Sequence, residues 1–296
     1  MSRFVLSVFA AGFMLVGSSV HAGDTPYDPV SMDPPKPDAA FPPVLHELLI
    51  PSHGVMLSGI MLGANGAGPH PTVLLLHGFP GNEKNLDLAQ SLRRAGYNVL
   101  FFHYRGAWGS QGDYTVGGQT GDVAAVLDYI RANAQRLRAD TGQLSIIGHS
   151  LGGFTALRAA AESRELNCVV GLAAYNFEPE ATYSEEQQKG MEGYVDQLFM
   201  LHNLTGARMT SEVAANTEAF DTRNLAAKLS GKSVLLIAAS EDKQVPPDMQ
   251  SRVVAVYEKN PDINLTAEVI PGDHAFSVSR IRLQRLVIDW MDKNCR

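Results

Sequence analysis

A serine lies at the centre of residues 143–154, where an apolar run meets a glycine-rich turn and a helix-forming segment follows at once. The turn reads Gly-His-Ser-Leu-Gly, with Ser150 between Gly148 and Gly152. In a sharp strand-to-helix turn the residues two before and two after the serine must lack bulk, and glycine meets that need. The hydroxyl of Ser150 would then emerge at the end of the strand. There it could attack a carbonyl carbon, with the Leu151 amide at the helix start facing the developing oxyanion.

A serine nucleophile needs a general base, and the order of the chain narrows the choice. Of nine histidines, only His202 and His274 follow Ser150. His202 falls in a long segment without strand-like runs, whereas His274 comes shortly after an apolar run. The catalytic loops of a doubly wound sheet lie at the carboxyl ends of its strands, which is also where Ser150 would emerge. We therefore expect His274 to be the base.

The base in turn needs a carboxylate to orient it. Asp242 follows another apolar run and is the predicted acid, with the adjacent Glu241 as its main alternative. Asp273 is poorly placed, because a residue next to the base cannot easily turn its carboxylate onto the imidazole ring. Glu178 and Glu180 remain as further alternatives. The order serine, aspartate, histidine along the chain is the one expected on this architecture.

The elements that must position these residues follow from the pattern of apolar runs. Short apolar runs predict strands over residues 45–50, 55–62, 72–76, 97–102, 144–147, 168–173, 233–238 and 265–270. Helical spacing predicts helices over residues 82–95, 119–138, 151–163, 248–257 and 276–291. Because strand and helix alternate, and the central strands are continuously apolar, we expect an α/β fold with a doubly wound, mostly parallel sheet and an edge hairpin.

One segment interrupts this alternation. Residues 176–230 contain no strand-like run, while methionine and aromatic residues recur near helical spacing between residues 191 and 201. A segment this long between two strands of a compact sheet is expected to be a helical lid or an inserted subdomain. Its methionine and aromatic side chains are expected mainly in the core of that lid rather than in a substrate pocket.

The N-terminus has the pattern of a secretory signal peptide over residues 1–22. A single cation, Arg3, precedes a short apolar core, and small residues lead to a cleavage site near Ala22. A membrane anchor is the alternative, but the apolar run is shorter than the roughly 20 residues that a bilayer requires. Residues 23–43 are rich in proline and predict an extended arm, and residues 44–296 form the expected main domain. We therefore expect an exported protein, periplasmic or secreted.

Composition bounds the classes of partner. The chain has 296 residues with 45% apolar content and a net charge of −7. This acidic balance, without any basic stripe, argues against a nucleic-acid partner and against electrostatic docking on anionic membranes. No two histidine, aspartate or glutamate residues recur at ligand spacing on a recognisable helix, so neither a metal nor another cofactor is expected.

The two cysteines, Cys168 and Cys295, are predicted to form a disulfide. If Ser150 emerges at the carboxyl end of its strand, Cys168 opens the next strand at the opposite edge of the sheet. A closing helix that begins near His274 must run back to that same edge and would bring Cys295 there. Export would supply the oxidising compartment that lets a disulfide persist. The alternative is two unpaired thiols, one buried and one near the frayed helix end.

These residues carry a resemblance to a known family. From about residue 45 to residue 290 the chain resembles α/β-hydrolase-fold serine hydrolases, on the motifs at residues 77–81, 148–153, 240–246 and 272–276. The loop at 104–110 and the Asp-His-Ala-Phe-Ser ending are similar to peptidases of the prolyl-oligopeptidase and proline-iminopeptidase kinds and to dienelactone hydrolases. Two departures are clear. No β-propeller is expected before the domain, and the expected nucleophile is serine where dienelactone hydrolases use cysteine.

The resemblance implies a triad of Ser150, Asp242 and His274. It also implies an oxyanion hole built from the backbone N–H groups of Phe79 and Leu151. It leaves the substrate open.

The chemistry expected is hydrolysis of a small ester or amide through an acyl-enzyme, without a cofactor. A carboxylesterase comes first, a small-peptide or aminopeptidase-like hydrolase second, and a hydrolase-fold binding protein without turnover third. His77 and Arg105 are expected to brace their loops rather than to take part in the chemistry. The oligomeric state and the bond cleaved, ester or peptide, stay open at the level of the sequence.

Overall fold

The computed structural model of the protein describes residues 26–34, 36–178 and 183–296. The expected signal peptide, residues 1–22, lies outside these ranges, and so does Glu180, one of the alternative acids. None of the helices within these ranges is long and apolar enough to cross a membrane.

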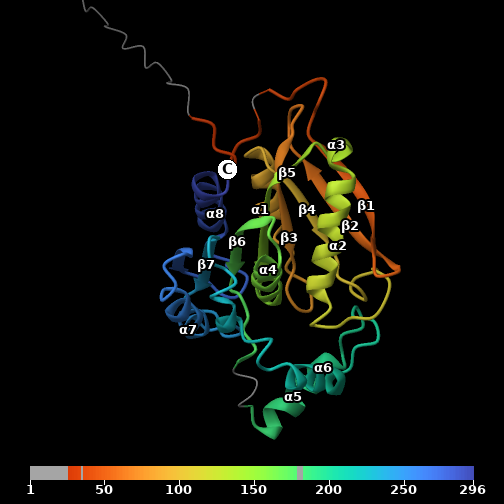
Figure 1. Ribbon diagram of the computed structural model, residues 1–296, viewed down its shortest axis with the longest axis vertical. Coiled ribbons are helices and arrows are strands. Elements are labelled where there is room, and N and C mark those ends of the chain that lie inside the picture. Colours follow the sequence, from red (N-terminus) through yellow and green to blue (C-terminus); the bar gives the residue numbers. More distant parts are fainter. Residues whose placement is uncertain (1–25, 35, 179–182) are drawn as a thin grey trace, which may run out of the picture.

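An eight-stranded sheet forms the centre of the molecule, in the order β1-β2-β4-β3-β5-β6-β7-β8 (Figure 1). Its strands are β1 (Val44–Ser52), β2 (Val55–Gly63), β3 (His70–Leu76), β4 (Asn98–Phe102), β5 (Ala139–His149), β6 (Leu166–Leu172), β7 (Ser233–Ala239) and β8 (Asn264–Ile270). The β1–β2 hairpin lies at one edge, and β2 runs antiparallel to β4. All other neighbouring strands pair in parallel. The predicted α/β class with a mostly parallel sheet is confirmed.

Helices cover both faces of this sheet. They are α1 (Leu86–Arg94), α2 (Gln119–Ala132), α3 (Ala134–Leu137), α4 (Leu151–Glu162), α7 (Pro247–Tyr257) and α8 (Arg280–Asn294). Alternate residues of one strand enter different cores: Leu74 of β3 packs in a cluster with side chains of α2, α4 and α7, and Val73 in a cluster with side chains of α1 and α8. The period of two along a strand explains why these strands are apolar throughout.

Two helices begin later than the sequence pattern predicts. Helix α1 starts at Leu86 rather than at residue 82, and α8 starts at Arg280 rather than at residue 276. Before α8 the chain makes tight turns, in which the Phe276 amide donates to the Asp273 carbonyl at 2.9 Å and Phe276 has a φ of 57°. Such a left-handed backbone cannot continue a helix, although the apolar spacing through this turn resembles one.

A helical insertion, residues 183–230, separates β6 from β7. It contains α5 (Glu185–Val195), α6 (Gly206–Ala215) and the 3₁₀ helix η2 (Thr222–Leu225). Helices α5 and α6 lie beyond one end of the sheet, opposite the end where the C-terminus lies (Figure 1). Backbone bonds tie the insertion to the loop after β4, with Trp108 N–H donating to the Met200 carbonyl at 3.0 Å. The Glu212 carboxylate also accepts from the Val116 and Gly117 amides, at 3.0 and 2.7 Å.

The other end of the sheet carries a covalent cross-link. Cys168, near the start of β6, is bonded to Cys295 just after α8, with their Cα atoms 5.7 Å apart. Helix α8 packs against β6 and runs back from the carboxyl ends of the strands, as the topological argument requires. Neither cysteine of the chain is free.

The proline-rich arm runs over the outside of the helices. Val30 is buried, Asp28 forms an ion pair with Arg285 of α8 at 2.6 Å, and Arg94 of α1 donates to the Pro29 carbonyl at 2.5 Å. The described part of this arm is therefore anchored to α1 and α8.

Candidate active site

Ser150 occupies a strained turn between β5 and α4. Its backbone has φ 57° and ψ −124°, a combination that non-glycine residues rarely adopt. A Cβ atom on Gly148 would lie 2.0 Å from the Gly152 carbonyl oxygen, and one on Gly152 would lie 2.5 Å from the His77 carbonyl oxygen. The neighbouring strand fixes the turn, because Ser150 N–H donates to the Leu172 carbonyl at 2.8 Å. The two glycines are therefore required by space, as their spacing predicts.

Asp242 and His274 form a hydrogen-bonded pair on the loops after β7 and β8. The His274 Nδ1 lies 2.7 Å from Asp242 Oδ2. The other carboxylate oxygen of Asp242 accepts from the Gln244 and Val245 amides, each at 2.8 Å. Burial alone would raise the pKa of Asp242, but the bonds from His274, Val245 and Gln244 outweigh it and lower that pKa. Asp242 is therefore held as a carboxylate against the histidine ring.

The alternative acids are engaged or exposed elsewhere. Glu241 is exposed to solvent. Glu178 forms ion pairs with Arg223 and Arg252, at 3.1 and 3.2 Å. The carboxylate of Asp273 accepts from the amide and hydroxyl of a serine in its own loop. Glu178 and Asp273 therefore bind partners other than the His274 ring, and Glu241 faces solvent.

His202 belongs to the helical insertion and lies far out on the surface. Its side chain is 72% exposed, and its Nδ1 lies 3.0 Å from Asp113 Oδ1. This contact helps to join the insertion to the loop after β4.

Ser150 and His274 line one cavity of about 270 Å³. Its lining consists of Phe79, Ser150, Leu151, Tyr175, Phe177, Tyr183, Met191, Tyr194, Met209, Gln244, Val245 and His274. Among these described residues none is aspartate, glutamate, lysine or arginine. One wall comes from the sheet edge and the other from the insertion, so the cavity is a mainly apolar space with the serine and the histidine in its wall.

The insertion differs here from the sequence-based expectation. Tyr194, expected in the core of the insertion, lines the cavity, whereas Met191 lines the cavity and also packs against an apolar cluster that includes Val195 and Met209 of the insertion. Phe199 is 92% exposed, whereas Leu198 and Met200 pack against the main core. Helical spacing indicates which residues share a face, but it does not say which surface that face meets.

The loop at residues 77–81 passes directly beside Ser150. A Cβ atom on Gly78 would lie 2.8 Å from the Ser150 Cβ, so the following residue, Phe79, is held next to the serine. Trp108 Nε1–H supports this loop by donating to the Pro80 carbonyl at 2.7 Å. Phe79 and Leu151 thus line the same cavity as Ser150.

His77 and Arg105 have the bracing contacts expected of them. His77 is buried, its Nδ1–H donates to the Gly78 carbonyl at 2.8 Å, and burial lowers its pKa to about 4. Arg105 forms an ion pair with Asp122 at 2.6 Å and donates to the Gly118 carbonyl at 3.0 Å.

His149 was not singled out by the sequence, yet it contacts the predicted base. Its Nε2 lies 2.7 Å from the His274 backbone oxygen, and the two ring centroids are 4.7 Å apart. His149 is buried, with only 3% of the residue exposed. The only sequence feature that could have pointed to His149 is its position directly before Ser150. That position does not reveal which group the imidazole contacts.

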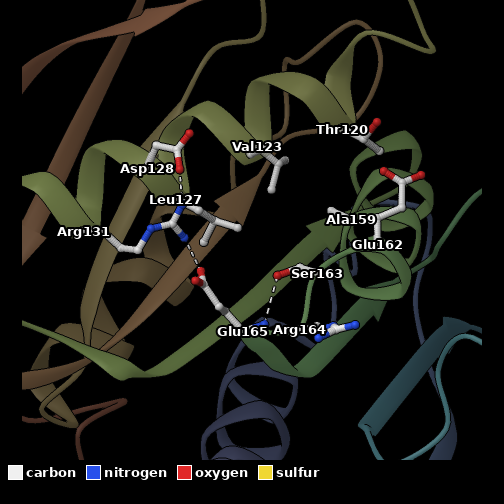
Figure 2. A pocket seen from close by; sticks show the side chains of 11 residues that line it. Thr120, Val123, Leu127, Asp128, Arg131, Ala159, Glu162, Ser163, Arg164 and Glu165 are labelled. Carbon is white, nitrogen blue, oxygen red and sulfur yellow. Dashed lines mark hydrogen bonds and ion pairs between the residues drawn. The ribbon is translucent and has the colours of Figure 1, made fainter.

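A second cavity, of about 280 Å³, lies between α2 and the end of α4. Figure 2 shows its polar lining, where Arg131 pairs with Asp128 and Glu165. Glu165 directly precedes β6, so this groove lies toward the amino ends of the strands, away from Ser150. Arg131 is already paired with two carboxylates, and the groove has no arrangement of nucleophile and base like that around Ser150.

No group of three or more histidine, cysteine, aspartate or glutamate residues in the described ranges is arranged to hold a metal ion.

The strand order, the serine turn and the loops that converge on it define an α/β-hydrolase-fold protein. The family model for the alpha/beta hydrolase fold matches residues 71–203 of the chain. Among solved structures, an esterase of Pyrococcus furiosus superposes with a TM-score of 0.63 and 22% identity, covering 87% of this chain and 93% of that one. An acylaminoacyl peptidase of Pyrococcus horikoshii superposes with a TM-score of 0.64 and 15% identity, covering 86% of this chain and 42% of that one.

Sequence relatives match over shorter stretches. An uncharacterized 31.7 kDa protein of Escherichia coli is 32% identical over 111 residues, which are 36% of this chain and 38% of that protein. The lysophosphatidylserine lipase ABHD12 of Gallus gallus is 37% identical over 86 residues, 28% of this chain and 21% of the lipase. The chain thus matches well under half the length of these relatives. The resemblance to α/β-hydrolase-fold proteins that the sequence motifs indicated is confirmed.

Proposed function

We propose that the protein is a serine hydrolase that cleaves a small carboxylic ester through an acyl-enzyme. One observation carries the proposal: Ser150 and His274 line the same apolar cavity, while Asp242 binds the ring of His274 at 2.7 Å. This arrangement contains a nucleophile, a base and an orienting acid in the order that the chemistry requires.

In the proposed reaction Ser150 Oγ attacks the ester carbonyl while His274 accepts its proton. The Asp242 carboxylate stabilises the imidazolium that forms, and the N–H groups of Phe79 and Leu151 stabilise the oxyanion. Collapse of the tetrahedral intermediate breaks the ester bond, and His274 returns the proton to the departing alcohol. Water, deprotonated by His274, then attacks the acyl-enzyme and releases the carboxylic acid.

The lining of the cavity favours an ester with a neutral acyl group. A free α-ammonium group needs a nearby carboxylate, and none of the described lining residues supplies one. Aromatic and methionine side chains instead suit an apolar acyl chain. A small-peptide hydrolase is the second candidate, supported by the similarity to an acylaminoacyl peptidase. A hydrolase-fold binding protein without turnover is the third.

A fluorophosphonate probe with a graded set of p-nitrophenyl esters and aminoacyl anilides tests the proposal. We expect covalent labelling at Ser150, none in Ser150→Ala, and faster turnover of esters than of anilides. Labelling without turnover of any ester or anilide would favour the binding protein, and faster anilide cleavage would favour the peptidase.

We also propose that the helical insertion serves as a lid that shapes the acyl site. Met209 of α6 lines the cavity. Met209→Trp should therefore lower kcat/KM for long acyl chains more than for acetyl esters, whereas an equal change for all esters would contradict this role.

We propose further that the protein is exported. The apolar N-terminal segment with its small-residue cleavage site supports this, and so does the disulfide, because such bonds persist mainly in oxidising compartments. Cell fractionation with N-terminal sequencing should find the mature chain outside the cytosol, beginning near residue 23. An uncleaved cytosolic chain would contradict the proposal.

A further inference from the structure

His149 ties the loop of the proposed base to the turn of the proposed nucleophile. Its Nε2 lies 2.7 Å from the backbone oxygen of His274. Asp242 meanwhile binds the ring of His274, also at 2.7 Å. His274 is thus held at two independent points, its ring by one loop and its main chain by the residue adjacent to Ser150.

The protonation state of His149 follows from this contact. A carbonyl oxygen only accepts, so Nε2 of His149 must carry the proton and donate it. Its Nδ1 is buried and has no hydrogen-bond partner among the described residues. Burial, followed by the charge of His274, lowers the pKa of His149 to about 3, with Arg280 acting in the same direction and Asp242 against it. His149 therefore stays a neutral donor while His274 gains and loses a proton.

The loop that His149 holds contains one strained residue, Phe276, and has two further anchors: Arg280 donates to the Ala275 carbonyl at 2.9 Å, and the Glu241 amide donates to the Gly272 carbonyl at 2.9 Å. Gly272 has a φ of 143° and Phe276 a φ of 57°, on either side of His274. The His149 ring also packs against both neighbours, with centroids 4.7 Å from His274 and 6.4 Å from Phe276. A strained loop keeps its shape only where surrounding contacts determine it.

We infer that His149 is a positioning residue, which sets the location of His274 relative to Ser150. One peptide bond joins His149 to Ser150, and one hydrogen bond joins it to the backbone of His274. The positions of the nucleophile and the base are therefore both fixed relative to the same residue. The inference rests on the proposed function, since it assigns His149 a part in the same reaction.

The first test compares variants of the exported protein with a p-nitrophenyl ester as substrate. His149→Phe keeps an aromatic ring but removes the donor, and a misplaced base should lower kcat by roughly 10- to 100-fold. KM should stay within about twofold, because the acyl cavity is untouched. His149→Gln retains a donor near the position of Nε2 and should restore kcat to within about fivefold of the wild type.

A comparison of His149→Gln with His149→Met controls for the possibility that His149→Phe fails to fold. His149→Met has nearly the shape of His149→Gln without the N–H donor, so their ratio of kcat reports the hydrogen bond. His70→Phe is the matched control, because His70 Nε2–H also donates to a backbone carbonyl, that of Gly66 at 3.1 Å, at the other end of the sheet. It should leave kcat unchanged.

A double-variant cycle separates positioning from general structural support. In a His274→Ala background, His149→Phe should lower the residual kcat no further, because it acts only through His274. A loss in that background equal to the loss in the wild type would overturn the inference. So would equal kcat for His149→Gln and His149→Met, or a raised KM with kcat unchanged.

Measuring Ser150→Ala in parallel distinguishes failure of the inference about His149 from failure of the proposed function. If Ser150→Ala is inactive and the His149 variants are fully active, His149 has no positioning role and the proposed function stands. If Ser150→Ala retains activity, the proposed function fails and the inference about His149 fails with it.

Discussion

The two ends of the parallel sheet are fixed by different kinds of bond. At the carboxyl ends, hydrogen bonds hold strained or ionised groups: Ser150 and Phe276 have positive φ angles, and Asp242 is a buried carboxylate. At the amino ends, the Cys168–Cys295 disulfide cross-links β6 to α8. Nearby, the Lys232 ammonium donates to two backbone carbonyls at 2.8 Å each.

The difference separates activity from stability. Groups at the carboxyl ends can exchange protons and accept strain because the amino ends secure the same strands without taking part in the chemistry. Changes at the carboxyl ends should therefore alter kcat with little effect on unfolding, and changes at the amino ends should do the reverse.

The largest expected effect is at Ser150. Ser150→Ala should lower kcat by about 10⁴-fold or more, because it removes the atom that becomes acylated. The free energy of unfolding by urea should change by less than about 1 kcal/mol, because the side chain supplies chemistry rather than core packing. More than about a tenth of wild-type activity in the variant would contradict the mechanism.

Asp242→Asn should come next, with kcat lower by about 10³- to 10⁴-fold, because an amide cannot stabilise the imidazolium. Glu241→Gln is the matched control one position earlier. Since Glu241 is exposed, its variant should keep kcat within about twofold. If the two variants exchanged these outcomes, Glu241 would be the acid and the geometry around His274 would be misassigned.

At the amino ends, the Cys168→Ala, Cys295→Ala double variant should lose stability but not activity. By the chain-entropy model, opening a loop of this length costs about 4 to 5 kcal/mol of unfolding free energy. Urea unfolding monitored beside ester turnover measures both quantities. Dithiothreitol should destabilise the wild type and leave the variant unaffected. Two reactive thiols in the unreduced, denatured wild type would show that the bond is absent.

The smallest expected effect is the change in stability per pH unit that each of the buried histidines His77 and His149 should cause. Burial lowers their pKa values to about 4 and about 3, whereas an unfolded histidine titrates near 6.5. Between these values the unfolded chain binds protons that the folded chain does not, so stability is complete above about pH 6.5 and is lost as the pH falls. Each residue should contribute a slope of about 1.4 kcal/mol per pH unit.

Urea unfolding at pH 7.5, 6 and 5 measures this slope, and His77→Phe should reduce it by the share of one histidine. An unchanged slope in His77→Phe would mean that folding does not lower the pKa of His77.

The sequence predicted the sheet well because its strands are buried on both faces. A continuous apolar run such as that of β3 is typical of a strand covered by helices on both sides. The order of such runs placed Ser150, Asp242 and His274 after three different strands, β5, β7 and β8. The structure pairs Asp242 with His274 and places His274 in the lining of the same cavity as Ser150. It also joins the two cysteines that the path of α8 was expected to bring to one edge.

The sequence predicted less where a contact depends on a turn or on the face of a helix. The start of α8 was misplaced because Phe276 adopts a left-handed backbone that apolar spacing does not reveal. The cavity contacts of Met191 and Tyr194 were not predicted, because their helical period does not identify every surface that they meet. His149 escaped notice because its partner is a backbone oxygen 125 positions away, which carries no side-chain signature.

The disulfide also determines how the molecule bears mechanical load. Residues 168 and 295 are 127 positions apart, and their bond closes that stretch, with the insertion, β7, β8 and α8, into a covalent ring. Tension applied to the chain beyond Cys295 would pass through the sulfur atoms into β6, a central strand, instead of peeling α8 from the surface. The ring cannot lengthen under that pull. An unfoldase that pulls on the chain beyond Cys295 must therefore extract the interior strand β6 first, unless the disulfide is reduced.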